Sequence, residues 1–172
     1  LSLRRQRQMC IRDRSTAEDL GYNHTYSIVA SDVDGNKKNL SFSTPQAAGV
    51  AEVSLTPIPD SEVGVGQVIG VNFGVPITDR KAAEKTITVT TNPEVKGAFY
   101  WVNNQEVRWR PKEYWEPGTK VEVKVDQYGK ALGGGIYGGE NAKTNFTIGD
   151  RTVAIIDNAT KTMKVFKNKK FL

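Results

Sequence analysis

The chain holds few of the side chains on which catalysis usually depends. It has one cysteine, Cys10, and one histidine, His24. Neighbouring arginines could lower the pKa of the Cys10 thiol, but a thiol nucleophile also needs a nearby base, and His24 lies on an unrelated segment. Cys10 also lacks the small residues expected before a lipid-anchor cysteine, and a lone cysteine forms no disulfide within the chain. We therefore predict no catalytic residue, no metal site and no cofactor site in this sequence, with His24 a solvated loop residue at a strand start.

Aromatic residues are the second group that could carry function, and they gather in residues 97–118, which contain all three tryptophans. Buried, such side chains form a core; exposed, they form a flat platform for sugars or for nucleic-acid bases. We expect packing to be their main role. The alternative is a glycan or interdomain contact, for which the candidates are Tyr114, Trp115 and Tyr137.

Glycines cluster in residues 133–140, G-G-G-I-Y-G-G-E. A phosphate-binding loop would need a buried strand before it, a helix after it and usually a Lys-Ser/Thr pair, and the sequence offers none of these. We predict a loop between the last strands of a domain, with a contact to a neighbouring domain or glycan as the alternative.

The net charge of +5 is concentrated at the two ends of the chain. Residues 1–14 carry +4 and residues 151–172 carry +5, so the remaining residues carry −4. A body of mixed, slightly acidic charge gives no support for nucleic-acid binding. The sequence also contains no run of eighteen apolar residues, the minimum for a membrane-spanning helix.

The aromatic segment itself predicts a β-hairpin over 98–102 and 106–110. Phe99 and Trp101 alternate with Tyr100 in the first strand, and Val107 and Trp109 share a face in the second. The intervening Asn-Asn-Gln supplies a turn, because asparagine tolerates positive φ and bonds its own backbone. Pro111 should end the return strand, because it has no N–H to donate.

Short strands between turn signals continue along most of the chain, which predicts an all-β fold. About seven strands within residues 50–149 favour an immunoglobulin-like β-sandwich without the antibody disulfide. One short helix is expected at 78–84, capped by Thr78 or Asp79. The predicted strands of this domain cover residues 51–56, 68–73, 86–91, 98–102, 106–110, 119–126 and 142–148.

The flanking segments predict incomplete modules. Strands at 25–31 and 38–44, joined by D-V-D-G-N, form a hairpin that we assign to the end of a preceding domain, residues 15–45, because two strands alone are marginal in water. Residues 150–172 predict a second hairpin that ends in an apolar Phe-Leu, which indicates truncation. We expect this hairpin to be frayed or to pair opportunistically with the sandwich.

Residues 1–14 differ from the rest, with no hydrophobic periodicity and no helix cap. They resemble a translated sequencing-adapter read-through and are interpreted as a foreign basic segment. A basic arm that binds nucleic acid or anionic lipid is the alternative.

One motif is specific enough to suggest a family: W-R-P-x-x-Y-W-x-P-G-T at residues 109–119. With residues 71–121 around it, it closely resembles the immunoglobulin-like domain before the catalytic domain of actinobacterial, especially mycobacterial, L,D-transpeptidases. The resemblance continues through I-Y-G-G-E and N-F-T-I-G-D to D-N-A-T-K-T-M-K-V, which is similar to the opening hairpin of a YkuD-type catalytic domain. Residues 15–45 are similar to the end of a first immunoglobulin-like domain in two-module members.

This resemblance implies an exported, usually lipid-anchored parent enzyme that forms 3-3 cross-links in peptidoglycan. A histidine-activated cysteine in an S-H-G-C type motif would attack a donor stem peptide, and an acceptor amine would resolve the thioester. The sequence has no such motif and no histidine after His24, so we expect this polypeptide to be inactive.

The implied partners are peptidoglycan stem peptides, bound through the catalytic domain, and that domain itself. The implied location is extracytoplasmic, in the cell wall or periplasm, with membrane attachment only through an N-terminal lipid anchor that this sequence lacks. The alternative function is a non-enzymatic module that binds the cell wall or mediates adhesion.

Overall fold

A computed structural model describes residues 19–171 of the chain. Two compact units are distinguished, Leu1–Gln46 and Ala47–Leu172. Cys10 and the predicted foreign segment 1–14 lie outside the described residues. No helix in the described part of the chain is long and apolar enough to cross a membrane.

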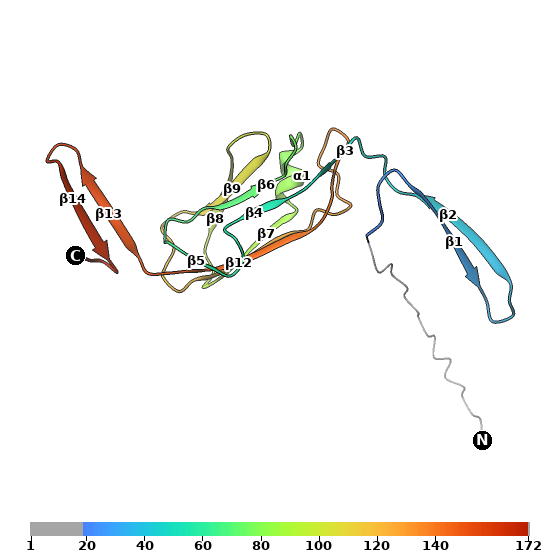
Figure 1. Cartoon of the computed structure of the whole chain (residues 1–172), viewed down its shortest axis with the longest axis horizontal. Coiled ribbons are helices and arrows are strands. Elements are labelled where there is room, and N and C mark those ends of the chain that lie inside the picture. Colours follow the sequence, from blue (N-terminus) through green and yellow to red (C-terminus); the bar gives the residue numbers. More distant parts are fainter. Residues whose placement is uncertain (1–18, 172) are drawn as a thin grey trace, which may run out of the picture. The chain divides into compact units, whose positions relative to one another are not determined.

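In the first unit, β1 (Thr25–Ser31) and β2 (Lys37–Ser43) form an antiparallel hairpin (Figure 1). The Asp32 carboxylate organises its turn, because it accepts hydrogen bonds of 2.9 Å from the backbone of Asp34 and from the backbone and side chain of Asn36. These bonds, the Asn36 side chain foremost, lower the pKa of Asp32. The predicted hairpin is therefore confirmed.

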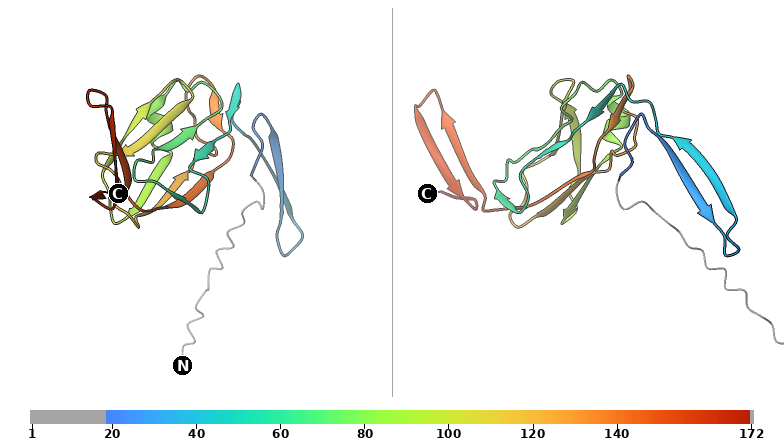
Figure 2. Two further views of the ribbon diagram at one scale, coloured as in Figure 1. Left: turned by 60° about the vertical axis from the view of Figure 1, so that its left-hand side comes forward. Right: turned by 45° about the vertical axis from the view of Figure 1, so that its right-hand side comes forward.

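The second unit contains a β-sandwich whose strands lie in two layers (Figures 1 and 2). Each layer is a four-stranded sheet, and both are antiparallel except where β5 pairs in parallel with β12. One sheet has the order β4 (Ser54–Thr56), β6 (Ile69–Asn72), β9 (Glu106–Pro111), β8 (Gly97–Trp101). The other has the order β5 (Ser61–Val63), β12 (Ala142–Ile148), β10 (Lys120–Val125), β7 (Ile87–Asn92).

Alternation along the strands builds the core between the two sheets. In β10, Val121, Val123 and Val125 are buried, as their period-two spacing predicts. In β9, Val107 and Trp109 are buried in the same way. The all-β, immunoglobulin-like prediction is confirmed.

Trp115 is the largest fully buried side chain and ties several segments together. Its indole N–H donates to the Gln67 carbonyl oxygen at 2.7 Å. Its ring centroid lies 5.6 Å from that of Trp109 and 6.4 Å from that of Phe146, in edge-on contact with the latter. Since Trp109 and Phe146 belong to opposite sheets, Trp115 packs between the layers.

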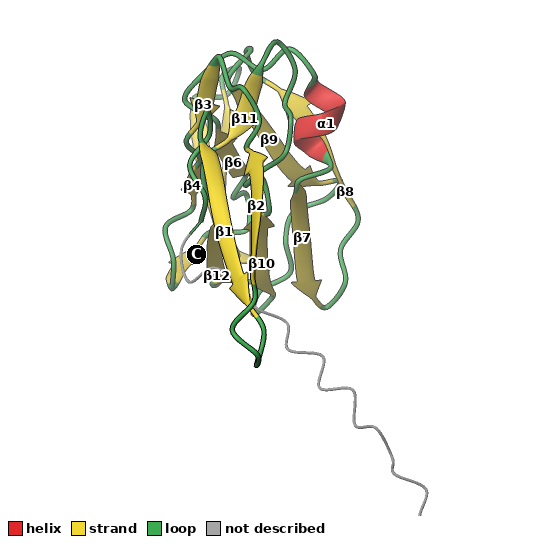
Figure 3. Ribbon diagram, turned by 90° about the vertical axis from the view of Figure 1, so that its right-hand side faces the viewer, coloured by secondary structure: helices red, strands yellow, loops and turns green. Residues whose placement is uncertain are grey.

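The predicted helix and the predicted aromatic hairpin are both present. Helix α1 (Arg80–Glu84) lies beside β8 (Figure 3), and the Asp79 carboxylate caps it by accepting from the Ala82 N–H at 3.0 Å. In the turn between β8 and β9, the Asn103 side chain accepts from the backbone N–H groups of Gln105 and Glu106.

Three details differ from the sequence predictions. The expected strand at 51–56 is divided into β3 (Gly49–Ala51), which pairs with β11 (Ile136–Gly138), and β4, which pairs with β6. The chain changes partner strand at Glu52-Val53, so one continuous strand is impossible. Strands β5 and β11 were not predicted, because three residues are too few to show a period; β11 lies inside the glycine cluster.

The C-terminal residues form a small antiparallel sheet of β13 (Thr152–Asp157), β14 (Thr162–Lys167) and β15 (Lys170–Phe171). The predicted turn is held by Asp157, whose carboxylate accepts from the Thr160 and Ala159 N–H groups, and these bonds lower its pKa. A two-stranded hairpin was predicted; the third strand returns through Asn168 and Lys169, both at positive φ.

We expect the Trp115→Ala variant to lose about 3–5 kcal/mol of unfolding free energy, because it leaves a large cavity between the sheets. Urea unfolding followed by circular dichroism measures this loss. Tyr114→Ala is the matched control: Tyr114 is 59% exposed, and its loss should cost less than about 1 kcal/mol. Equal losses for the two variants would contradict the role assigned to Trp115.

A second prediction concerns acid stability. Bonds from Lys143 and then Lys124 lower the pKa of Glu122 from an ordinary 4.5 to about 2. A depressed carboxylate pKa stabilises the fold fully above pH 4.5, and this stabilisation is lost as the pH falls towards 2. In urea titrations across that range, Glu122→Gln should flatten the pH dependence of the midpoint. The control Glu113→Gln, which removes a carboxylate with no ion-pair partner among the described residues, should keep the wild-type slope.

Candidate functional site

The three predicted contact residues lie in very different environments. Trp115 is only 1% exposed, so its ring offers no face to a ligand, and the idea of Trp115 as a surface platform is not supported. Tyr137 is half-buried in β11, opposite Val50 of β3. Tyr114 is 59% exposed and is the one that presents its ring to solvent.

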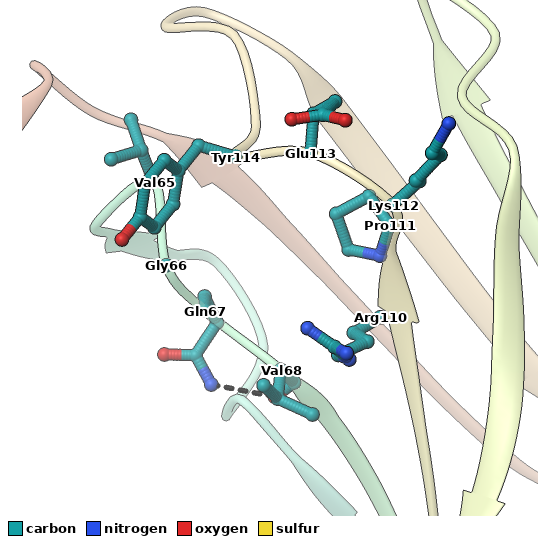
Figure 4. Close-up of a pocket in the computed structure, with 9 residues that line it drawn as sticks. All are labelled: Val65, Gly66, Gln67, Val68, Arg110, Pro111, Lys112, Glu113 and Tyr114. Carbon is teal, nitrogen blue, oxygen red and sulfur yellow. Dashed lines mark hydrogen bonds between the residues drawn. The ribbon is translucent and has the colours of Figure 1, made fainter.

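Tyr114 lines a surface pocket of about 230 Å³ on the sandwich. Figure 4 shows its two walls: residues 65–68, which lead into β6, and residues 110–114, at the end of β9. The Tyr114 ring lies over the Val65-Gly66 side, and the Arg110 guanidinium points towards Val68 (Figure 4). The pocket is open, and its 110–114 wall carries both the Tyr114 ring and the Arg110 guanidinium.

Backbone bonds fix the two walls against each other. The Trp115 N–H donates to the Val65 carbonyl oxygen at 3.0 Å, in addition to the bond of its indole to Gln67. The inward Trp115 therefore places the preceding Tyr114 on the rim. The Gln67 side chain donates to the Val68 carbonyl oxygen at 2.7 Å, which holds that amide at the pocket edge.

Arg108 and Arg110 both project from the outer face of β9, but they differ in whether a carboxylate pairs with them. Arg108 forms an ion pair with Glu106, with Nε 2.7 Å from the carboxylate oxygen. Arg110 has no carboxylate within 4.0 Å among the described residues. Its charge is therefore uncompensated at the pocket, and sequence reasoning did not identify it.

Tyr114 also contacts the segment that leads into the C-terminal sheet. The Arg151 guanidinium carbon lies 5.8 Å from the centroid of the Tyr114 ring, within cation–π range. A pocket of about 280 Å³ lies at the same junction, lined by Glu116, Pro117, Asp150, Arg151, Asn168 and Lys169. Tyr114 therefore contacts Arg151, which lies just before β13 in the same unit.

Hydrogen bonds of Asn168 hold this junction together. Its backbone N–H donates to the Arg151 carbonyl oxygen at 2.8 Å, and its side-chain oxygen accepts from the Arg151 N–H at 3.0 Å. Its amide group donates to Asp150 at 3.1 Å, and Lys167 pairs with the same carboxylate at 3.0 Å. The Asn168 bond first, and then Lys167, lower the pKa of Asp150.

His24 is exposed just before β1, as predicted, and its ring centroid lies 6.1 Å from that of Tyr26. The part of the chain that the structure describes contains no group of three or more His, Cys, Asp or Glu side chains that could hold a metal ion. The pocket walls instead supply a tyrosine ring, an arginine and backbone polar groups.

Comparison with known proteins identifies relatives of this chain. L,D-transpeptidase 2 of Mycobacterium tuberculosis (strain CDC 1551 / Oshkosh) is 45% identical over 157 residues, which cover 90% of this chain and 38% of that protein. L,D-transpeptidase 5 of M. tuberculosis (strain ATCC 25618 / H37Rv) is 33% identical over 153 residues, 83% of this chain and 34% of that protein. The chain thus spans between a third and two fifths of the length of these relatives.

Solved structures that resemble this chain are also L,D-transpeptidases. L,D-transpeptidase LdtMt1 in complex with imipenem superposes with a TM-score of 0.60 and 31% identity, over 72% of this chain and 51% of that one. The crystal structure of L,D-transpeptidase 3 from M. tuberculosis has a TM-score of 0.53 and 27% identity, over 69% and 46% of the two chains.

A family model described as a bacterial Ig domain matches residues 12–131. That match, the two-layered sheet and the resemblance to mycobacterial L,D-transpeptidases over most of the chain agree with one another, and this chain belongs to the bacterial Ig domain family.

Proposed function

We propose that this chain is the immunoglobulin-like portion of a peptidoglycan L,D-transpeptidase and that it supports the catalytic domain of that enzyme. The observation that carries this proposal is the 45% identity to L,D-transpeptidase 2 over 90% of the chain. Identity at that level over both the sandwich and its flanks argues for a shared role rather than for a shared fold alone.

The proposal assigns a role to each part of the chain. Residues 15–45 are the end of a first Ig-like domain, residues 50–149 are a complete second one, and residues 150–172 are the first strands of the catalytic domain; residues 1–14 are foreign. The hydrogen-bond pattern supports the last of these limits, since the sandwich ends with β12 at Ile148 and β13, β14 and β15 form a sheet of their own.

In the proposed reaction, a cysteine of the catalytic domain attacks the amide after the third residue of a donor stem peptide. D-alanine leaves, and an amine of an acceptor stem then opens the thioester to form a 3-3 cross-link. The residues of this chain contribute positioning. The Tyr114–Arg151 contact and the Asn168 bonds tie the sandwich to the strands that would enter the catalytic domain.

The same proposal locates the protein outside the cytoplasm, in the cell wall, as a secreted protein attached to the membrane through an N-terminal lipid anchor. Its partners would be peptidoglycan stem peptides and its own catalytic domain.

A chimera tests the proposal. Residues 19–172 of this chain replace the corresponding segment of M. tuberculosis L,D-transpeptidase 2, and 3-3 cross-link formation from purified stem peptides is measured. We expect activity within about tenfold of the parent enzyme, because the junction contacts are retained. The control is the same chimera with the catalytic cysteine replaced by serine. A chimera that folds but forms no cross-links, with the parent active alongside, would overturn the proposal.

A second candidate is a wall-binding module that acts without an attached enzyme, and the exposure of Tyr114 beside an open pocket favours it. This candidate would replace the first if the chimera were inactive while the chain alone co-sedimented with purified peptidoglycan.

A further inference from the structure

A second pocket lies next to the one that contains Tyr114. It has a volume of about 610 Å³ and is lined by residues 96–100, which include most of β8, and by residues 110–112, at the end of β9. Because Val107 and Trp109 point into the core, Arg108 and Arg110 point outward. Ala98 is the register partner of Arg110, and Tyr100 is the partner of Arg108, so all four share the outer face of the sheet.

The short side chain of Ala98 leaves space on the outer face of β8. Gly97 beside it faces inward, where a Cβ atom would overlap the Trp109 ring and the Arg110 carbonyl oxygen. Tyr100, which is 68% exposed, stands two residues along the same face. Ala98 therefore forms the base of the pocket, and the Tyr100 ring forms one side.

The charge of the pocket has a single sign. Lys96, Arg110 and Lys112 line it, and no carboxylate does. None of these three cations has an ion-pair partner within 4.0 Å in the described part of the chain. The planar guanidinium of Arg110 can bind a carboxylate through two parallel hydrogen bonds, which a lysine cannot do.

The two pockets share three lining residues. Arg110, Pro111 and Lys112 line both of them, and in Figure 4 these residues stand opposite the Val65–Val68 wall. An unpaired arginine thus lies between two exposed tyrosines, Tyr100 on one side and Tyr114 on the other. Glu113 on the rim is the one acidic residue that lines either pocket.

We propose that this tract, the outer surface from Tyr100 through Arg110 to Tyr114, binds a saccharide that carries a carboxylate. The apolar face of a sugar ring packs on an exposed tyrosine, and Arg110 receives the carboxylate. A nucleic acid would need a broader basic surface than these three cations provide. The identity of the saccharide rests on the proposed function: in peptidoglycan, the sugar with a free carboxylate is N-acetylmuramic acid from which the stem peptide has been removed, because an attached stem holds that carboxyl group in an amide bond.

Calorimetric titration of the full chain with the disaccharide N-acetylglucosaminyl-N-acetylmuramic acid, its lactyl carboxylate free, tests the proposal. Neutral N,N′-diacetylchitobiose is the matched ligand without a carboxylate. We expect the acidic disaccharide to bind at least about tenfold more tightly, because a charge-assisted bidentate bond contributes most of the difference.

Variants locate the site. Arg110→Gln should weaken binding of the acidic disaccharide by about tenfold, and Tyr100→Ala should weaken both ligands. Lys120→Gln, the same charge change on the opposite sheet, should leave affinity within about twofold. All these side chains are exposed, so the variants should unfold at wild-type temperature, and a thermal scan checks that they do.

Equal binding of the two disaccharides, or unchanged affinity in a folded Arg110→Gln variant, would overturn the proposal. So would equal weakening by Lys120→Gln, which would indicate unspecific charge attraction. A free stem peptide that binds as well as the disaccharide would show a peptide site instead. Any of these results beside an active chimera would leave the proposed function intact, whereas an inactive chimera with normal saccharide binding would remove only the enzyme assignment.

Discussion

The burial of Trp115 between the two sheets is the interaction on which the rest of this domain depends. Pro111 ends β9, since it has no N–H for a further ladder bond, and the chain then crosses to the other layer. There the Gly118 N–H donates to the Ile148 carbonyl oxygen at 2.7 Å. Trp115 fills the space along this crossing and touches a ring from each sheet, so one side chain fixes the spacing of both layers.

The same crossing determines which side chains are exposed to solvent. With Trp115 inward and bonded to Gln67, the neighbouring Tyr114 must lie on the surface over Gly66. In β9, inward Val107 and Trp109 likewise force Arg108 and Arg110 outward. Glu106 neutralises the first arginine and leaves the second unpaired, which gives the surface one uncompensated guanidinium between two exposed tyrosines.

The supporting role that we propose requires a defined junction at the end of the sandwich, and the hydrogen bonds there provide one. Asp150, Arg151 and Asn168 connect the last sandwich strand to the C-terminal sheet through backbone as well as side-chain bonds. Backbone bonds tolerate sequence change better than side-chain contacts do.

The sequence by itself determined the fold class, the aromatic hairpin, the strand at 120–125 and the capped helix, because alternation, turn residues and caps act over a few neighbouring residues. It could not determine β5 and β11, which exist only through parallel pairing with distant strands, or the break at Glu52-Val53. Nor could it separate Tyr114 from Trp115, or Arg110 from Arg108, as binding groups. Which aromatic ring is buried and which charge is left unpaired depends on neighbours brought together by long-range packing, and only the tertiary structure decides that.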